Sequence, residues 1–261
     1  MSRVSIVTTS WDDGDPCDLR VAELLRARGL PGTFYAPFVG HHGREVLTPR
    51  QLRELVAEGF EVGGHTLSHS VLPELLPRKI AWEVGACKSR LEDILGEHVR
   101  MFCYPKGQFN TNVIQHVKRA GYEGARTTRM LRVDAGFDAF EMPTSVQAYP
   151  HSQWAYIKNL ARHAGSRDLC KFLINCRGLN WREIGKKLFD RVLFEGGVWH
   201  LYGHSWEIER LNLWNDLREM LDHVSKRDDV IYLSNFEVTH HLAGNSKKRA
   251  SSLTNKLPAL G

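Results

Sequence analysis

The stretch VTTSWDDGDP at residues 7–16 decides how the rest of the chain is interpreted. A run rich in β-branched residues, typical of a strand, ends in Asp12 and Asp13 and is followed by a glycine, which indicates a turn. Two neighbouring carboxylates repel each other when ionised, unless a positive group lies between them or they have separate tasks. The pair therefore raises the question of which positive group the fold brings to it.

Short apolar runs alternate with amphipathic stretches through the first half of the chain. The composition predicts strands within residues 4–10, 32–38, 60–64 and 99–105. Helices are expected from residue 18, with Asp18 as N-cap, and from residue 48, with Thr48 as N-cap and Pro49 in the first helical position. Two further helices are expected within residues 78–97 and 111–120, and a strand is expected after the second, before residue 128. This alternation predicts parallel βα units, in an open doubly wound sheet or a barrel.

The alternation of predicted strands and helices becomes less regular after about residue 135. Residues 135–154 look like a long irregular connection, and helices are expected from about 152 to 192. A strand at 196–206, an amphipathic helix at 211–227 and a last strand or strand–helix junction near 229–238 follow. We predict one domain over residues 1–243 and a basic, mobile tail over 244–261.

Composition excludes several classes of function. The net charge of +5 owes much to the tail, and no dense basic run carries interleaved aromatics, so no nucleic-acid partner is expected. There is no leader-like start and no run of about 18 apolar residues, so we expect no membrane span. The five scattered cysteines are typical of reduced thiols in the cytoplasm. The sequence carries no signal for an oligomeric state.

Polar residues follow four of the predicted strands. Beside the aspartate pair these are HTLSH with His65 and His69, CYPKGQFN, and HLYGHSWE with His204. Ligand sites of parallel α/β folds gather at the carboxyl ends of strands. Spacing of four residues would put His65 and His69 on one side of a helical turn. With one carboxylate they make a set that suits Zn, Co, Mn or Fe(II), and the second carboxylate would act as a base toward water.

The motifs SWDDG, HTLSH, YPKG and YGHS, in this order and spacing, resemble those of the polysaccharide deacetylase family, a group with chitooligosaccharide-deacetylase homology and carbohydrate-esterase chemistry. The resemblance spans about residues 5–240. It implies an α/β fold, a single-domain distorted (β/α) barrel, and metal-dependent hydrolysis of an N- or O-acetyl (acyl) group on a sugar.

The resemblance also implies roles for particular residues. Asp12 would be the general base and His204 the general acid. Asp13, His65 and His69 would bind a divalent metal, zinc before cobalt, manganese, iron or nickel. The loop that contacts the oxyanion and the substrate would be Tyr104, Pro105, Lys106 and Gly107.

Two positions depart from the family pattern. Cys103 stands where family members often carry an arginine that orients the base, and Arg126 is the candidate replacement. The family's aspartate that tunes the acid histidine is not recognisable, and Asp134, Asp138 and Glu207 stay open for that role.

The expected substrate is a soluble acetylated sugar, such as a nucleotide-linked or glycan-precursor intermediate. One alternative keeps the fold and hydrolyses a non-sugar C–N bond, as allantoinase-like and imidase-like relatives do. Another is a non-catalytic sugar-binding relative. The tryptophans near the motifs suit sugar faces, and core packing explains them at least as well; they are Trp11, Trp199 and Trp206. His200 is expected to be structural.

Overall fold

Eight parallel strands form one sheet in the computed structural model, which describes residues 4–40, 43–163 and 174–254. The strands are β1 (Ser5–Asp12), β2 (Thr33–Ala36), β3 (Glu61–Gly64), β4 (Met101–Cys103), β5 (Gly124–Arg126), β6 (Val146–Gln147), β7 (Gly197–Gly203) and β8 (Val230–Tyr232). Their order is β5-β4-β3-β2-β1-β7-β6. Strand β8 pairs with the first residues of β1 and β2 with its last residues.

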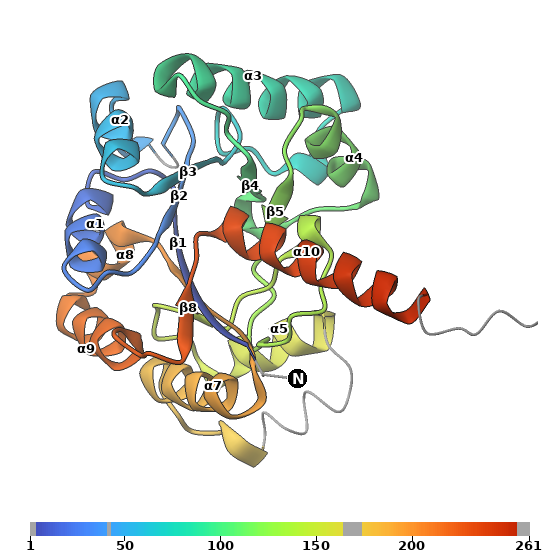
Figure 1. Cartoon of the computed structure of the whole chain (residues 1–261). Helices are drawn as coiled ribbons and strands as arrows, with labels where there is room; N and C mark the ends of the chain where they lie inside the picture. Colours follow the sequence, from blue (N-terminus) through green and yellow to red (C-terminus); the bar gives the residue numbers. More distant parts are fainter. Residues whose placement is uncertain (1–3, 41–42, 164–173, 255–261) are drawn as a thin grey trace, which may run out of the picture.

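The sheet curves into a distorted (β/α) barrel with helices around it (Figure 1). A parallel bridge between Arg126 and Met142 extends the outer side of β5. The predicted barrel of a single domain is thereby confirmed, and the open doubly wound sheet is not adopted.

Strand β1 shows why the two aspartates separate. Side chains alternate between the two faces of a strand. Val7 and Trp11 belong to the large apolar cluster, whereas Ile6 belongs to a second cluster with Tyr35 and Met101. Asp12 shares the face of Ile6, so its carboxylate enters the barrel interior. Asp13 follows the strand and lies outside this alternation.

Helices cover the outside of the barrel. They are α1 (Asp18–Arg26), α2 (Pro49–Ala57), α3 (Pro77–Leu95), α4 (Thr111–Arg119), α5 (Gln153–His163), α7 (Trp181–Glu195), α8 (Ser205–Arg210), α9 (Trp214–Val224) and α10 (Asn235–Thr254), with short 3₁₀ turns at Leu72–Glu74, Pro105–Gly107 and Ala139–Glu141. Thr48 caps α2 as predicted, in a capping box with Gln51. Gly96 ends α3 in the left-handed conformation, φ 73°.

Three details differ from the sequence-based expectations. Asp18 is the first residue of α1 and fully buried, and the N-cap position is Cys17, so the predicted cap is wrong. Strand β6 lies within the stretch expected to be irregular, and α8 follows β7 directly. Both are too short to produce a periodic pattern.

Helix α10 begins beside the amino ends of β2 and β3, opposite the ends that carry the motifs. The backbone N–H groups of Asn235 and Phe236 donate to Thr33 Oγ1 (3.0 Å) and Glu61 Oε2 (3.1 Å). The predicted boundary at residues 243/244 falls inside this helix, and residues 255–261 lie outside the described part of the chain. Within the described residues, no helix combines the length and apolar composition needed to cross a bilayer.

Candidate active site

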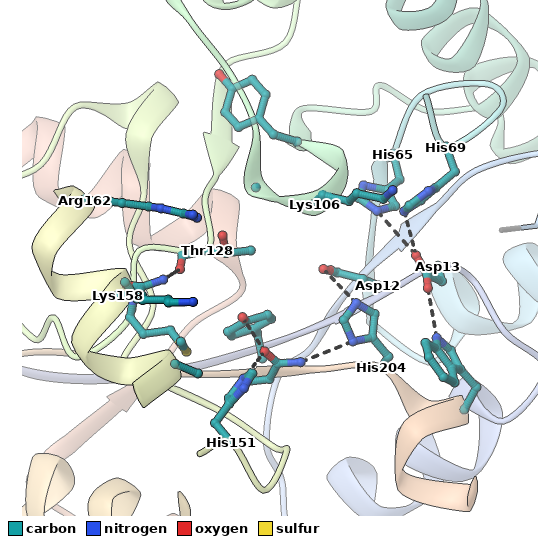
Figure 2. Close-up of a pocket in the computed structure, with 18 residues that line it drawn as sticks. Asp12, Asp13, His65, His69, Lys106, Thr128, His151, Lys158, Arg162 and His204 are labelled. Atoms are coloured by element: carbon teal, nitrogen blue, oxygen red, sulfur yellow. Dashed lines mark hydrogen bonds and ion pairs between the residues drawn. The ribbon is translucent and has the colours of Figure 1, made fainter. Parts of the chain in front are cut away.

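A cavity of about 430 Å³ lies at the carboxyl ends of the strands and gathers most of the predicted site residues (Figure 2). Those lining it are Asp12, Asp13, His65, His69, Tyr104, Lys106, Gly107 and His204. The two remaining predicted residues lie behind this surface, since Pro105 is buried in the loop and Arg126 is buried behind Asp12. These predicted residues come from four segments distant in sequence, which thus converge on one cavity of a size usual for small-molecule sites.

Asp13, His65 and His69 form the tightest group, hereafter the Asp13 cluster. Oδ1 of Asp13 lies 3.1 Å from Nε2 of His69 and 3.6 Å from Nε2 of His65. One ligand atom from each residue lies within 4.8 Å of the other two, and all three residues are buried. The imidazole rings meet edge to face, with centroids 4.9 Å apart.

The backbone places the cluster in a way that the sequence did not predict. The segment between His65 and His69 is a loop, not a helical turn, with Thr66 and His69 in the left-handed conformation at φ 61° and 53°. Asp13 also has a positive φ, 77°. Positive φ is uncommon for residues other than glycine, and such outliers concentrate at functional sites. The imidazoles meet as expected, but through loop geometry.

The donor set of the Asp13 cluster fits a divalent metal. Nδ1 of His65 lies 2.9 Å from the carbonyl oxygen of Cys103, so Nδ1 donates a hydrogen bond to that oxygen and Nε2 is the nitrogen that faces Asp13. A lone pair aimed at a carboxylate is unfavourable unless a proton or a cation lies between them. Two imidazole nitrogens and one carboxylate oxygen suit zinc and related ions and leave positions open for substrate.

The outer oxygen of Asp13 is held by Arg44, which the sequence interpretation missed, and by Trp206, for which it suggested other roles. The indole N–H of Trp206 donates to Oδ2 (2.9 Å), and Nη2 of Arg44 lies 3.5 Å from the same atom. The Arg44 guanidinium stacks 3.7 Å above the Trp206 ring. Such partners orient a ligating carboxylate. Burial would raise the pKa of Asp13, but the imidazoles outweigh it and hold that pKa well below its ordinary value.

Asp12 is held by Arg126, the residue offered as a replacement for the family arginine. Nη2 of Arg126 donates to Oδ1 of Asp12, and both side chains are buried. The guanidinium lies 4.7 Å from the Tyr202 ring centroid, while the thiol of Cys103 lies 3.7 Å from Oδ2 of Asp12. Burial would raise the pKa of Asp12, but Arg126 and nearby imidazoles lower it below its ordinary value. The carboxylate is therefore ionised and fixed in orientation.

His204 turns one nitrogen toward Asp12 and the other toward Glu207. Its Nε2 lies 3.9 Å from Oδ2 of Asp12, and its Nδ1 lies 2.8 Å from Oε2 of Glu207. Gln147, on the strand that the sequence did not reveal, donates to the same Glu207 oxygen (3.2 Å). Burial by itself would lower the pKa of His204, but Glu207 and the two aspartates raise it.

Of the three acidic residues considered for tuning His204, the structure brings only Glu207 to it. Asp134 pairs with Nε of Arg132 at 2.6 Å. Asp138 caps a short 3₁₀ turn by accepting from the N–H of Phe140 (2.8 Å). The relevant sequence signal was helical spacing, because Glu207 lies three residues after His204 at the start of α8.

The YPKG loop closes another side of the cavity. Lys106 has φ 55°, and Gly107 donates its N–H to the Tyr104 carbonyl (2.8 Å). The Tyr104 hydroxyl donates to the carbonyl of Phe140 (3.0 Å), and its ring stacks on Phe109. The loop is thus fixed at both ends while the side chain of Lys106 stays exposed at the cavity.

The remaining residues considered from sequence are either buried structural residues or part of the cavity lining. His200 is structural, since its Nδ1 donates to the carbonyl of Pro143 (3.0 Å) and its Nε2 pairs with Ser10 (2.9 Å). Burial lowers its pKa to about 3. Trp11 and Trp199 pack in the core, whereas Trp206 lines the cavity.

Comparison with known proteins gives the same assignment as the motifs. Residues 2–125, which include the aspartate pair, the histidine motif and the YPKG loop, match the family model of polysaccharide deacetylases. The first half of the chain is similar to a polysaccharide deacetylase domain. The resemblance predicted from the motifs is confirmed over these residues, which hold the first three motifs, whereas the YGHS motif lies outside them.

The curated relatives match less than half of the chain. The chain is 31% identical over 121 residues to a chitooligosaccharide deacetylase of Bradyrhizobium sp., covering 44% of this chain and 52% of the relative. It is 29% identical over 120 residues to a peptidoglycan-N-acetylglucosamine deacetylase of Bacillus cereus, covering 45% and 54%. The chain therefore spans about half the length of these curated relatives.

The whole chain shares its fold with a Mycobacterium smegmatis protein assigned to the polysaccharide deacetylases. The two structures align with a TM-score of 0.66 over 94% of this chain and 95% of the other. Sequence identity is 17%, so this likeness concerns the barrel and not the substrate.

Proposed function

We propose that this protein removes an acetyl group from a sugar with the help of a divalent metal ion. One observation carries the proposal. Asp12 and His204 lie 3.9 Å apart at their nearest charged atoms, in the same cavity as the Asp13 cluster. A potential base, a potential acid and a potential metal site therefore share one substrate-sized space, as hydrolysis of an acyl group requires.

Asp13, His65 and His69 would hold the metal, and zinc is the ion that this donor set favours, ahead of cobalt, manganese, iron or nickel. Such an ion would supply Lewis acidity that polarises the acyl carbonyl and eases loss of a proton from water. Trp206 and Arg44 keep the Asp13 carboxylate aimed at the cluster through its outer oxygen.

Asp12 would take the proton from the attacking water. Its oxygen Oδ1 is engaged by Arg126, which leaves Oδ2 facing His204 and the cavity. A carboxylate held ionised accepts a proton only from a water whose acidity is already increased, which fits the neighbouring Asp13 cluster. Arg126 acts as a positioning residue for this base.

His204 would protonate the leaving nitrogen of an acetamido group. An amine leaves poorly unless it is protonated, and an imidazole whose pKa is raised stays protonated to higher pH. Developing negative charge on the carbonyl oxygen needs an N–H donor as well. Because Gly107 uses its N–H within the YPKG loop, we assign the donor to the N–H of Lys106.

The proposed substrate is an acetylated sugar, in the form of a soluble glycan precursor or a nucleotide-linked sugar. The matched relatives named for chitooligosaccharide and for peptidoglycan N-acetylglucosamine deacetylation support the acetylated sugar. The cytoplasmic location predicted from composition remains a prediction, which cell fractionation tests.

The test compares the wild type with Asp12→Asn on a panel of acetylated sugars, following acetate release and metal content together. We expect acetate from the wild type, and a loss of at least 100-fold in Asp12→Asn with metal content retained, since general bases contribute about 10²–10⁴-fold. Unchanged turnover in Asp12→Asn removes the base role. Ring opening of cyclic amides without any acetate release supports the alternative of a non-sugar C–N hydrolase.

A further inference from the structure

The wall of the cavity that faces the Asp13 cluster carries positive charge. Lys158 and Arg162 of α5 both line the cavity, and their spacing of four residues puts them on one side of the helix. Figure 2 shows both side chains extending from α5 into the space across from Lys106 and Asp12. We call Lys158 and Arg162 the basic wall.

The basic wall has no acidic counterpart in the described part of the chain. Neither Lys158 nor Arg162 forms an ion pair there. By contrast, the two arginines that most closely precede α5 in sequence are both paired, Arg129 with Glu141 at 2.6 Å and Arg132 with Asp134 at 2.6 Å. The acidic residues that line the cavity, Asp12 and Asp13, are already engaged by Arg126, the imidazoles and Arg44. The uncompensated charge facing the cavity is therefore positive.

Helix α5 is fixed relative to the site by a side chain between the two basic residues. The Asn159 amide donates to the carbonyl of Thr128 (2.8 Å), and its oxygen accepts from the N–H of Met130 (3.0 Å). Thr128 and Met130 themselves line the cavity. The helix that carries the basic wall is thus anchored beside the cavity, although the side chains of Lys158 and Arg162 are exposed.

We infer that the substrate carries a phosphate group that the basic wall binds while its acetyl group lies at the Asp13 cluster. This inference rests on the proposed deacetylase function and narrows it to phosphorylated acetylated sugars, including those linked through a diphosphate. Arginine and lysine form charge-assisted hydrogen bonds to phosphate oxygens. A neutral sugar polymer offers these two cations no anionic partner.

The test compares acetate release from N-acetylglucosamine 1-phosphate, UDP-N-acetylglucosamine and neutral N-acetylglucosamine. We expect kcat/KM to favour the phosphorylated sugars in the wild type. Lys158→Gln/Arg162→Gln is expected to reduce this preference about tenfold, mainly through KM, because each exposed charge contributes only a few-fold. The ratio of kcat/KM between the two phosphorylated sugars shows whether the basic wall binds one phosphate or two.

The matched control is Arg53→Gln/Arg119→Gln, which removes the same charge from exposed positions on α2 and α4 outside the cavity lining. It is expected to keep the wild-type preference. An equal loss in both double variants would mean that overall charge, not the basic wall, attracts the substrate, and it would overturn the inference.

Binding separates this inference from the proposed function. Titration calorimetry with inorganic pyrophosphate and with the three sugars needs no turnover. Phosphate-dependent binding that weakens in Lys158→Gln/Arg162→Gln but not in the control supports the basic wall even if no acetate is released, in which case the deacetylase function fails alone. Acetate release without any preference for phosphorylated sugars, or pyrophosphate binding that is undiminished in the double variant, overturns the inference.

Discussion

Arg126 donates a hydrogen bond to Asp12 from 114 residues further along the chain, and both side chains are buried. The two ends of this ion pair come from β5 and β1, which lie four places apart in the sheet. The pair meets across the barrel interior because Asp12 and Arg126 occupy inward-facing positions at the carboxyl ends of their strands. The two adjacent aspartates therefore have different partners. Asp12 is paired with the guanidinium of Arg126, and Asp13 lies beside the imidazoles of His65 and His69.

Replacing Arg126 tests its positioning role. Arg126→Met is expected to lower kcat about 10- to 100-fold with little change in KM, because Asp12 loses its orientation. The pKa of Asp12 should rise when the guanidinium is gone, so the acidic limb of the rate profile should move to higher pH. Steady-state kinetics over a pH series measures both effects.

A conservative change provides the control for Arg126. Arg126→Lys keeps the charge and should recover part of kcat and most of the pH shift. In the Asp12→Asn background, Arg126→Met should cause little further loss, because the interaction has already been removed. Equal losses in both backgrounds would contradict a role that operates through Asp12.

Glu207→Gln tests the tuning of His204. The carboxylate favours the protonated imidazole, and its loss should lower the pKa of His204. Since the acid must be protonated to act, the alkaline limb of the rate profile should move to lower pH, by up to about one unit. Asp134→Asn is the matched control, because that aspartate pairs with Arg132 and should leave the profile unchanged. A Glu207→Gln profile identical to the wild type would remove Glu207 from this role.

His204→Ala should separate two kinds of substrate. We expect turnover of an acetamido sugar to fall about 10²- to 10⁴-fold, because the amine leaves unprotonated. Hydrolysis of 4-nitrophenyl acetate should fall less than tenfold, since its leaving group needs no proton. Rates are measured on both substrates, and the rate of the Asp12→Asn variant is subtracted as the background. Similar losses on the two substrates would count against an acid role.

Glu61 links stability to pH at the opposite end of the barrel. Burial raises its pKa to about 7, although it accepts hydrogen bonds from Thr33 and Phe236. The folded state therefore holds this proton more tightly than the unfolded state, and its stabilising effect is lost as pH rises from about 5 to 8. In Glu61→Gln, the difference in unfolding free energy between these pH values should shrink by about 1–3 kcal/mol.

Urea denaturation at pH 5 and pH 8 measures this effect. The control is Glu97→Gln, a change at an exposed position after α3 that should preserve the wild-type difference. If Glu61→Gln retained the full wild-type pH dependence, ionisation of Glu61 would not be its source.

The parts of the fold and site that follow strong local patterns were predictable from sequence. Apolar runs indicated β1 to β4 and β7, and the strand–helix alternation indicated β5. The motifs at the strand ends placed Asp12, Asp13, His65, His69 and His204 at one edge of the sheet. Residues that act across long sequence separations were harder to predict. Arg126 was only a candidate because nothing local connects it to Asp12, and Gln147 lies on a strand of two residues. Trp206 fitted several interpretations until its indole N–H was found at Asp13.

The same limit explains the geometry of the histidine pair. Spacing of four residues predicted a helical turn, whereas Thr66 and His69 adopt positive φ values that the sequence does not predict. The side chain of Glu83 fixes this loop by accepting from the backbone N–H (3.0 Å) and hydroxyl (2.7 Å) of Ser68. That contact joins α3 to the loop and is a tertiary interaction, so local propensity does not contain it.

The most direct test of the proposed metal site is elemental analysis of zinc-saturated, dialysed protein, comparing the wild type with His69→Ala and with the surface control His98→Ala. We predict about one ion per chain in the wild type and in His98→Ala, and a large loss in His69→Ala. Wild-type protein that retains no ion, or His69→Ala protein that retains as much as the wild type, would contradict the assignment of Asp13, His65 and His69 as its ligands.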